Sequence, residues 1–196
     1  MKARSRTSKG PAELRSDLLA AAAELFSGRG FSDVAVSDIT DRAGVAAGTF
    51  YRYFPSKDDV ITELRRDVFR QVLERTASVF RDPGDDGWWG AADRMIDASI
   101  RFWFEDRARS VVVLRGAAGV EGASTELALL SAFAAGLRIG QEEGAVAADL
   151  DVSVAATVLL HGSFGLVRNA LMDDGHDIDA LIVAVTQLAE RMLKPV

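Results

Sequence analysis

Residues 37–57, SDITDRAGVAAGTFYRYFPSK, hold the side chains of this chain that are best suited to meet a phosphate backbone. Arg52 has a guanidinium, which can donate two parallel hydrogen bonds to the edge of a guanine base. Tyr51 and Tyr53 have phenolic donors, and Lys57 adds a positive charge near the start of a following helix. The segment therefore predicts an interface with a nucleic acid.

Two short helices and a tight turn would position these groups. Ser37 is a good N-cap for the first helix, and Gly44 ends that helix because glycine accepts the left-handed conformation that a C-terminal turn needs. A second helix runs over about 46–53, and Pro55 ends it. Ser56 starts the next helix as its N-cap. Two short helices joined by a glycine turn are typical of a helix-turn-helix motif, whose second helix lies in the major groove of DNA.

The residues GVAAGTFYRYFPSKDDV resemble the recognition helix of TetR-family transcriptional regulators and the start of the helix that follows it. The resemblance extends over residues 14–65, about a quarter of the chain. It implies that DNA is contacted by Ser37, Thr49, Tyr51, Arg52, Tyr53 and Lys57. The alternative for the two tyrosines is that they only cover the hydrophobic seam, with their hydroxyls in water.

The start of the second helix departs from the family pattern. Ala46 and Ala47 stand where many members have a polar or basic residue, so this helix offers fewer contacts to bases and phosphates. We therefore expect sequence specificity to depend on Arg52, Ser37, backbone amides and DNA shape.

Composition sets limits around this interpretation. The 196 residues suffice for one large or two small domains, and the absence of cysteine excludes disulfides and cysteine-based metal sites. The net charge of −6 is unevenly distributed: residues 1–60 hold nine Lys/Arg and eight Asp/Glu, net +1, and the rest hold 14 and 21, net −7. The acidity lies outside the segment predicted to bind DNA and would orient the molecule toward it.

The N-terminal residues 1–9, MKARSRTSK, contain four cations and no acid. They are either a basic arm that enters the minor groove or an ordinary disordered terminus, and the sequence leaves both open. The apolar run LLAAAA is too short for a secretory signal, and charges or glycines break every later apolar run. We therefore expect a cytoplasmic protein with no membrane-spanning segment.

Apolar residues recur at helical spacing along the whole chain, which predicts an all-α fold. VVVL at 111–114 favours a strand but has no partner run. Further helices are expected at 11–27, 56–81, 88–106, 108–116, 124–143, 152–172 and 178–193. The expected division is a flexible basic arm (1–10), a three-helix DNA-binding domain with the helix-turn-helix (11–56), a connecting helix (57–81) and a domain for ligand binding and dimerisation (82–196).

The predicted helix 88–106 has one apolar, aromatic face. This face is either ordinary core or part of a ligand cavity, and the family resemblance favours the cavity because TetR-like proteins commonly bind an inducer among their middle helices. The candidate ligand-binding residues are Met95, Ser99, Phe102, Trp103, Phe133, Leu137, His161 and Phe164.

The last two predicted helices, 152–172 and 178–193, are expected to form an αα-hairpin. Two such hairpins could pair as a four-helix interface in a homodimer, which is also what the resemblance implies. Small residues spaced by four, Ala132, Gly136, Gly140 and Gly144, form a ridge that predicts close packing.

Catalysis finds little support in the sequence. The two histidines, His161 and His176, lack metal-ligand spacing, and no phosphate loop, nucleophile elbow or dinucleotide fingerprint occurs. The acids around His176, in MDDGHDID at 172–179, allow a hydrolytic or metal site as an alternative, but the pattern favours a polar turn in which Asp177 caps the last helix.

The sequence therefore predicts a regulator with no cofactor, no metal and no enzymatic activity. Its expected partners are double-stranded DNA, a small-molecule effector and a second copy of the chain. The alternative is a helical small-molecule-binding protein with weak or residual DNA binding.

Overall fold

The structure is a computed structural model that describes residues 10–76, 79, 84–115, 120–173, 175 and 177–195, with residues 120–125 described by their backbone. The described residues form helices and connecting turns without a β-strand, as the sequence predicts. The predicted basic arm, apart from Gly10, and His176 lie outside the described residues.

The helices follow one another in the order in which the hydrophobic pattern predicts them. They are α1 (Pro11–Arg29), α2 (Val36–Ala43), α3 (Ala47–Tyr53), α4 (Lys57–Thr76), α5 (Gly87–Glu105), α6 (Arg107–Arg115), α7 (Val120–Glu142), α8 (Val152–Met172) and α9 (Ile178–Leu193). The β-prone run 111–114 lies within α6, because tertiary packing overrides a local strand preference.

The turn between α2 and α3 has the predicted chemistry, but the start of α2 does not. Gly44 has φ of 68° and ends α2 in the left-handed conformation. The prediction that Ser37 is the N-cap is wrong, because α2 already begins at Val36. The cap is closed instead by the Asp38 carboxylate, which accepts a hydrogen bond of 2.9 Å from the backbone N–H of Ala35.

The first three helices pack around fully buried apolar side chains. Leu18 of α1, Ile39 of α2 and Phe50 of α3 are each inaccessible to solvent. This core continues through Val60 and Leu64 of α4 toward the helices that follow. Helices α2 and α3 are short and bury few side chains each, so their orientation depends on this shared core.

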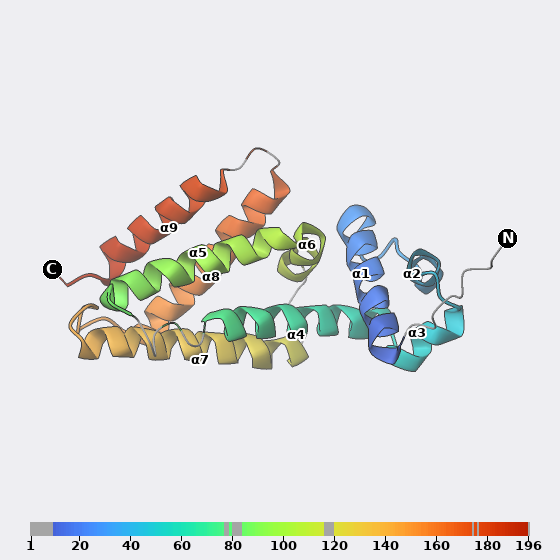
Figure 1. Ribbon diagram of the computed structural model, residues 1–196, viewed down its shortest axis with the longest axis horizontal. Helices are drawn as coiled ribbons and strands as arrows, with labels where there is room; N and C mark the ends of the chain where they lie inside the picture. Colours follow the sequence, from blue (N-terminus) through green and yellow to red (C-terminus); the bar gives the residue numbers. More distant parts are fainter. Residues whose placement is uncertain are drawn as a thin grey trace.

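Helix α4 extends from the α1–α3 group into the rest of the molecule (Figure 1). It packs against α7, α5 and α6, and α6 also packs against α1. Helices α1–α3 lie at one end of the molecule, and α9 lies toward the other (Figure 1). Helices α4 and α6 thus connect the helix-turn-helix to the C-terminal helices.

The last two helices follow each other across a short connection, as the predicted αα-hairpin requires. Helix α9 packs mainly against α5, and α8 packs against α7 and α6. Ala155 and Leu159 of α8 also share one apolar cluster with Ala189 and Leu193 of α9. The hairpin therefore has α5 as a further packing partner.

The small-residue ridge of α7 receives the side chain of Trp88 in α5. The Trp88 indole Nε1 donates a hydrogen bond of 2.9 Å to the Gly136 carbonyl. A Cβ at Gly140 would lie 2.6 Å from Trp88 Cε2 and 2.6 Å from Val146 Cγ2. Gly136 and Gly140 serve close packing, as the sequence predicts, whereas Gly144 lies beyond α7 in a turn with φ of 74°.

Substitution Gly140→Ala should destabilise the fold even though alanine favours helices. A methyl group at this position has no room, and overpacking of a core costs about 1–3 kcal/mol. Gly28→Ala in α1 is the control, because a Cβ there meets no atom within 4 Å. Thermal unfolding should show a lower Tm for Gly140→Ala and an equal or higher Tm for Gly28→Ala. Equal Tm values for both variants and the parent would contradict this account of the ridge.

Candidate nucleic-acid interface and ligand cavity

Helix α3 presents its polar side chains to solvent because its aromatic residues anchor it. Phe50 and Phe54 are buried, and the Phe50 ring lies 5.3 Å from that of Tyr51 and 5.8 Å from that of Phe54. Tyr51 is 61% exposed and Arg52 is also exposed. A rigid helix with an exposed guanidinium and phenol can enter a groove of DNA.

Arg52 differs from the other arginines around the helix-turn-helix. Arg42 pairs with Glu24, and Arg29 lies 3.5 Å from Asp38. Arg15 Nη2 lies 2.5 Å from Glu63 Oε1. Within the described part of the chain, Arg52 makes no ion pair, so its guanidinium is available to an external acceptor.

The other predicted DNA contacts surround Arg52 with different exposures. Ser37 is exposed on α2, and Thr49 and Tyr53 are half-buried on α3. Ala46, Ala47 and Gly48 leave the N-terminal end of α3 uncovered. The backbone of this end can therefore approach a phosphate closely, although no long side chain extends from it.

Lys57 has partners that sequence reasoning did not foresee. Its ammonium donates hydrogen bonds to the carbonyls of Phe31, at 2.9 Å, and Val34, at 2.5 Å, and lies 4.5 Å from the centre of the Phe31 ring. Lys57 thus ties the start of α4 to the segment between α1 and α2. An ammonium has three N–H donors, so a contact with phosphate stays a prediction.

A small apolar hollow, here called the inner cavity, lies between α4, α5, α7, α8 and α9. Its volume is about 60 Å³. Its wall is almost entirely apolar, and the hydroxyls of Thr76 and Ser163 donate to carbonyls of their own helices, Val72 and Leu159. The wall includes Val72, Thr76, Met95, Ile96, Ser99, Ile100, Trp103, Leu129, Phe133, Leu159, Leu160, Ser163, Phe164, Val167 and Val185.

A second hollow of about 30 Å³, here called the end compartment, adjoins the inner cavity. The two share Met95, Phe133 and Ser163 among their wall residues. The ring of Trp88, fixed against α7, lines the far part of the end compartment together with Leu137. Binding sites for small molecules usually measure about 300–1,000 Å³, so this space must widen to admit a ligand.

The structure brings most of the predicted ligand-binding residues to this region. Met95, Ser99, Trp103, Phe133 and Phe164 line the inner cavity, and Leu137 lines the end compartment. His161 lies outside both, in a separate hollow that also contains Arg65.

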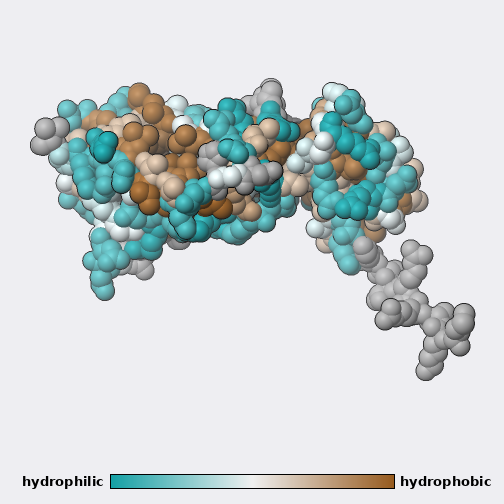
Figure 2. Space-filling view, turned by 90° about the horizontal axis from the view of Figure 1, so that it is seen from above, coloured by the Kyte–Doolittle hydropathy of each residue, from teal (hydrophilic) through white to brown (hydrophobic). Residues whose placement is uncertain are grey.

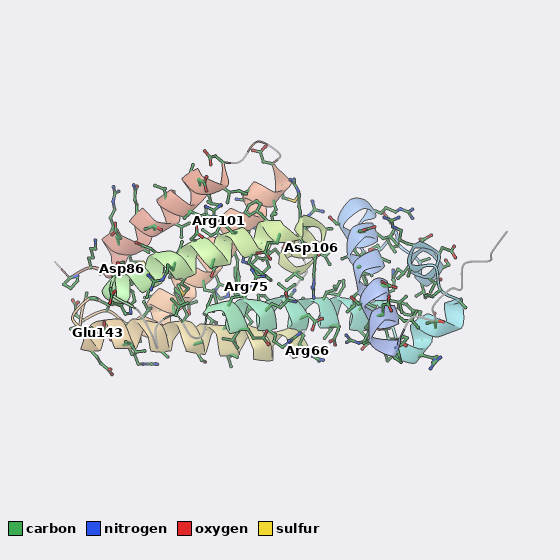
Figure 3. All side chains as sticks on the ribbon, in the orientation of Figure 1. Arg66, Arg75, Asp86, Arg101, Asp106 and Glu143 are labelled. Atoms are coloured by element: carbon green, nitrogen blue, oxygen red, sulfur yellow. The ribbon has the colours of Figure 1, made fainter. Side chains whose placement is uncertain are left out.

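Phe102 is a correction to the predicted set, because it lines none of the described hollows. It precedes Trp103 on α5 and points about 100° away from it around the helix. Its ring packs under the Arg75 guanidinium of α4, whose carbon lies 4.7 Å from the ring centre. Arg75 rises from α4 toward α5 (Figure 3), where it forms two hydrogen bonds of 2.6 and 2.8 Å with Glu105. These bonds raise the pKa of Arg75 and lower that of Glu105.

Sequence reasoning missed the contribution of α4 to the cavity. Val72 and Thr76 line the inner cavity, and Arg65 lies on the same face of α4 about two turns before Val72, with 6% of its surface exposed. Burial lowers the pKa of Arg65, and the charge of Glu126 raises it in part. The apolar spacing of α4 shows which of its residues are buried, but not that the buried face is partly hollow.

Comparison with known proteins agrees with this architecture. The sequence model of the family described as bacterial regulatory proteins, tetR family, matches residues 18–64. The chain is 34% identical over 97 residues to the HTH-type transcriptional regulator YvdT of Bacillus subtilis, covering 50% of this chain and 48% of YvdT. It is 28% identical over 166 residues to the HTH-type transcriptional repressor KstR2 of Rhodococcus jostii, covering 81% of this chain and 80% of KstR2. The chain thus aligns with about half of YvdT.

Solved structures share the fold over nearly the whole length. The fatty acid degradation regulator FadR from Bacillus halodurans superposes with a TM-score of 0.82 at 24% identity, covering 94% of this chain and 97% of that one. The transcriptional regulator FadR from Bacillus subtilis, solved in complex with stearoyl-CoA, superposes with a TM-score of 0.77 at 24% identity, covering 89% of this chain and 96% of that one. At this identity the likeness establishes the fold.

Proposed function

Since the chain belongs to the TetR family of bacterial regulatory proteins, we propose that it is a cytoplasmic, ligand-responsive transcriptional repressor. In this proposal a homodimer occupies a near-palindromic operator and leaves it when a small, largely apolar molecule binds. The observation that carries the proposal is the double role of α4. This helix is tied to the helix-turn-helix by Lys57 and lines the inner cavity with Val72 and Thr76.

Arg52 is the proposed reader of a base edge. It is the long donor on α3 and its guanidinium has no intramolecular ion pair within the described residues. Thr49, Tyr51 and Tyr53 would contact phosphates or a neighbouring base, Ser37 would do so from α2, and the remaining donor of Lys57 would reach a phosphate. Phosphate contacts position the protein, and the base contact specifies the sequence.

The proposed dimer interface is the apolar face of α8 and α9. Val154, Val158 and Leu166 of α8 are exposed, as are Val183 and Leu188 of α9. Viewed from the side on which α8 and α9 lie in Figure 1, hydrophobic residues gather on the surface of the C-terminal part (Figure 2). A patch of this kind is typical of a surface that another protein covers.

Helix α8 corrects the expectation that no segment resembles a membrane span. By length and composition Val152–Met172 could cross a membrane, although one such helix is weak evidence for that. Its buried side packs on α6 and α7. A second copy of the chain that covers the remaining apolar side of α8 would explain why this side is apolar. Two copies related by a two-fold axis would present their two α3 helices to half-sites about one DNA turn apart.

Effector binding would change DNA binding through a shift of α4 and α6. The inner cavity must widen, and α4 forms part of its wall. Helix α4 is linked to α6 through Asp67 and Arg109, at 3.4 Å, and α6 packs against α1. A shift of α4 would therefore change the separation of the two recognition helices in a dimer. Coupling of this kind is reciprocal, so DNA should weaken effector binding as much as the effector weakens DNA binding.

The relatives support this type of function. KstR2 of Rhodococcus jostii is named a repressor, and the FadR of Bacillus subtilis was solved with stearoyl-CoA, a molecule with a long apolar chain. The apolar wall of the inner cavity suits an effector that has such an apolar part.

A footprint on the DNA that flanks the gene of this protein tests the proposal. The expected result is one protected region with two related half-sites, whose protection disappears when a cell extract containing the effector is added. Absence of protection on this DNA, with a folded dimeric protein, would favour the alternative of a small-molecule-binding protein with residual DNA binding.

A further inference from the structure

A third hollow, here called the outer hollow, shares Phe164 with the wall of the inner cavity. Its volume is about 310 Å³, and it is open to solvent. Unlike the inner cavity, it is lined by charged and polar side chains from α4, α7 and α8: Arg65, Glu126, His161 and Arg168. Its apolar wall is made by Phe69, Val113, Leu114, Phe164 and Gly165.

The charges around the outer hollow favour an anion. Two guanidinium groups, Arg65 and Arg168, face one carboxylate, Glu126, so the wall has a net charge of +1 with His161 neutral. The Glu126 carboxylate also contacts His161, because its Oε1 lies 2.9 Å from His161 Nε2. The Nδ1 of that ring lies 3.1 Å from the Thr157 carbonyl.

The position of Arg65 is unusual for a charged residue. It lies within the buried part of α4, next to Leu64 and four residues before Phe69, whose ring centre is 5.9 Å from its guanidinium carbon. Its guanidinium lies near the Glu126 carboxylate, and the planar guanidinium of an arginine suits the recognition of a carboxylate or a phosphate.

Phe164 is the partition between the two hollows. It is a wall residue of both. Its ring lies 5.7 Å from that of Phe69 on α4 and 5.4 Å from that of Trp103 on α5. Rotation of this single half-buried side chain would join a polar, open space to a narrow apolar one.

We propose that the outer hollow binds the anionic head of the effector through Arg65 and Arg168, while the apolar chain of the same molecule passes Phe164 into the inner cavity. The effector is then an anionic amphiphile, with a carboxylate or phosphate head. This inference rests on the proposed function. It also gives α4 two contacts with the effector, at Arg65 and at Val72, on the helix that leads to the helix-turn-helix.

Three compounds that have a twelve-carbon chain and differ in the head group distinguish the contribution of the head from that of the chain. They are dodecanoate, dodecyl phosphate and 1-dodecanol, each used below the concentration at which it aggregates. Binding to the full-length dimer is measured by the intrinsic tryptophan fluorescence, because Trp103 lines the inner cavity and Trp88 and Trp89 line the end compartment. The parent protein should bind at least one of the anions about tenfold or more tightly than the alcohol, because hydrogen bonds to charged groups are strong. The stronger anion identifies the head as carboxylate or phosphate.

The variants are Arg65→Met, Arg65→Lys and Arg168→Gln, with Arg66→Gln as the control. Arg66 neighbours Arg65 on α4 but is exposed and pairs with Glu63. Arg65→Met and Arg168→Gln should each lose about tenfold in affinity for the anion and keep their affinity for the alcohol. Arg65→Lys should restore part of the preference, and Arg66→Gln should leave all affinities unchanged. Sedimentation checks that each variant remains dimeric, since the outer hollow borders the proposed dimer face.

Three results would overturn the proposal: no binding of either anion, no preference for an anion in the parent protein, or equal losses for anion and alcohol in the two arginine variants. The last result would mean that Arg65 and Arg168 only hold α4 and α8 in place. Release of operator DNA is measured in parallel. If the alcohol and the anion release operator DNA equally, the proposed head-group site is wrong and the proposed repressor function stands. If the protein prefers the anion but has no affinity for DNA, the proposed repressor function is wrong and the head-group site stands.

Discussion

Replacing Arg52 by alanine is expected to abolish most of the preference for the operator over unrelated DNA while leaving the fold unchanged. Arg52 is exposed on α3 and makes no ion pair within the described residues, so its removal leaves no buried partner behind. A bidentate contact with a base contributes about 1–3 kcal/mol of discrimination, and a dimer uses two copies. The two contacts lie far apart and should add, which gives about 2–6 kcal/mol, or a factor of at least about 30 in relative affinity.

Arg101→Ala is the matched control for this substitution. It removes the same charge from α5, where Arg101 pairs with Asp97 and Asp179, away from α3 (Figure 3). Competition binding with operator and scrambled fragments at one salt concentration measures the preference of each variant. If Arg52→Ala weakened binding to both fragments equally, Arg52 would be a phosphate contact and sequence would be read by Ser37, Thr49 or DNA shape.

If the chain is the effector-responsive repressor proposed above, filling the inner cavity should leave it bound to the operator in the presence of its effector. Ser163 lies in the wall that the inner cavity shares with the end compartment, and its hydroxyl donates a hydrogen bond to the carbonyl of Leu159 in its own helix. In Ser163→Leu the added methyl groups occupy much of the 60 Å³ of space. Operator affinity should be unchanged, because the substitution favours the closed arrangement of α4, α5 and α8. Release by the effector should be lost at concentrations that free the parent protein.

The control variant Ser163→Ala distinguishes the effect of filling the inner cavity from the effect of losing the Ser163 hydroxyl. It removes the hydrogen bond to Leu159 without occupying the cavity, so its response to the effector should be that of the parent protein. Both variants are compared in a reporter strain in which the operator controls a measurable product. Normal induction of the reporter by Ser163→Leu would show that the effector binds elsewhere.

Local chemistry made the helix-turn-helix predictable from the sequence. Gly44, Pro55 and the buried aromatic pair Phe50 and Phe54 act within a few residues of one another, so their effects on α2 and α3 can be inferred without a tertiary structure. The boundaries of α8 and α9 were predicted at the residues where the structure has them, because Asp151 and Asp177 cap helices with strong apolar spacing.

Contacts between distant segments could not be predicted in this way. The partners of Lys57 lie 26 and 23 residues earlier in the chain. Phe102 and Trp103 are both aromatic and buried, and only the position of α4 decides which of them reaches the cavity. The position of α9 against α5, and the placing of Arg65 beside Glu126, likewise depend on how helices pack. Periodicity identifies a buried face, but not the element that covers it.

The central claim, that this chain recognises a particular DNA sequence through α3, is tested most directly by a salt titration. Binding of the dimer to the fragment that flanks its own gene is compared with binding to a scrambled fragment of equal length. The account predicts that the logarithm of both affinities falls linearly with the logarithm of salt concentration. It also predicts that the native fragment stays at least about a thousandfold preferred at physiological salt. Equal affinity for the two fragments at every salt concentration, or no binding even at about 50 mM salt, would contradict the account.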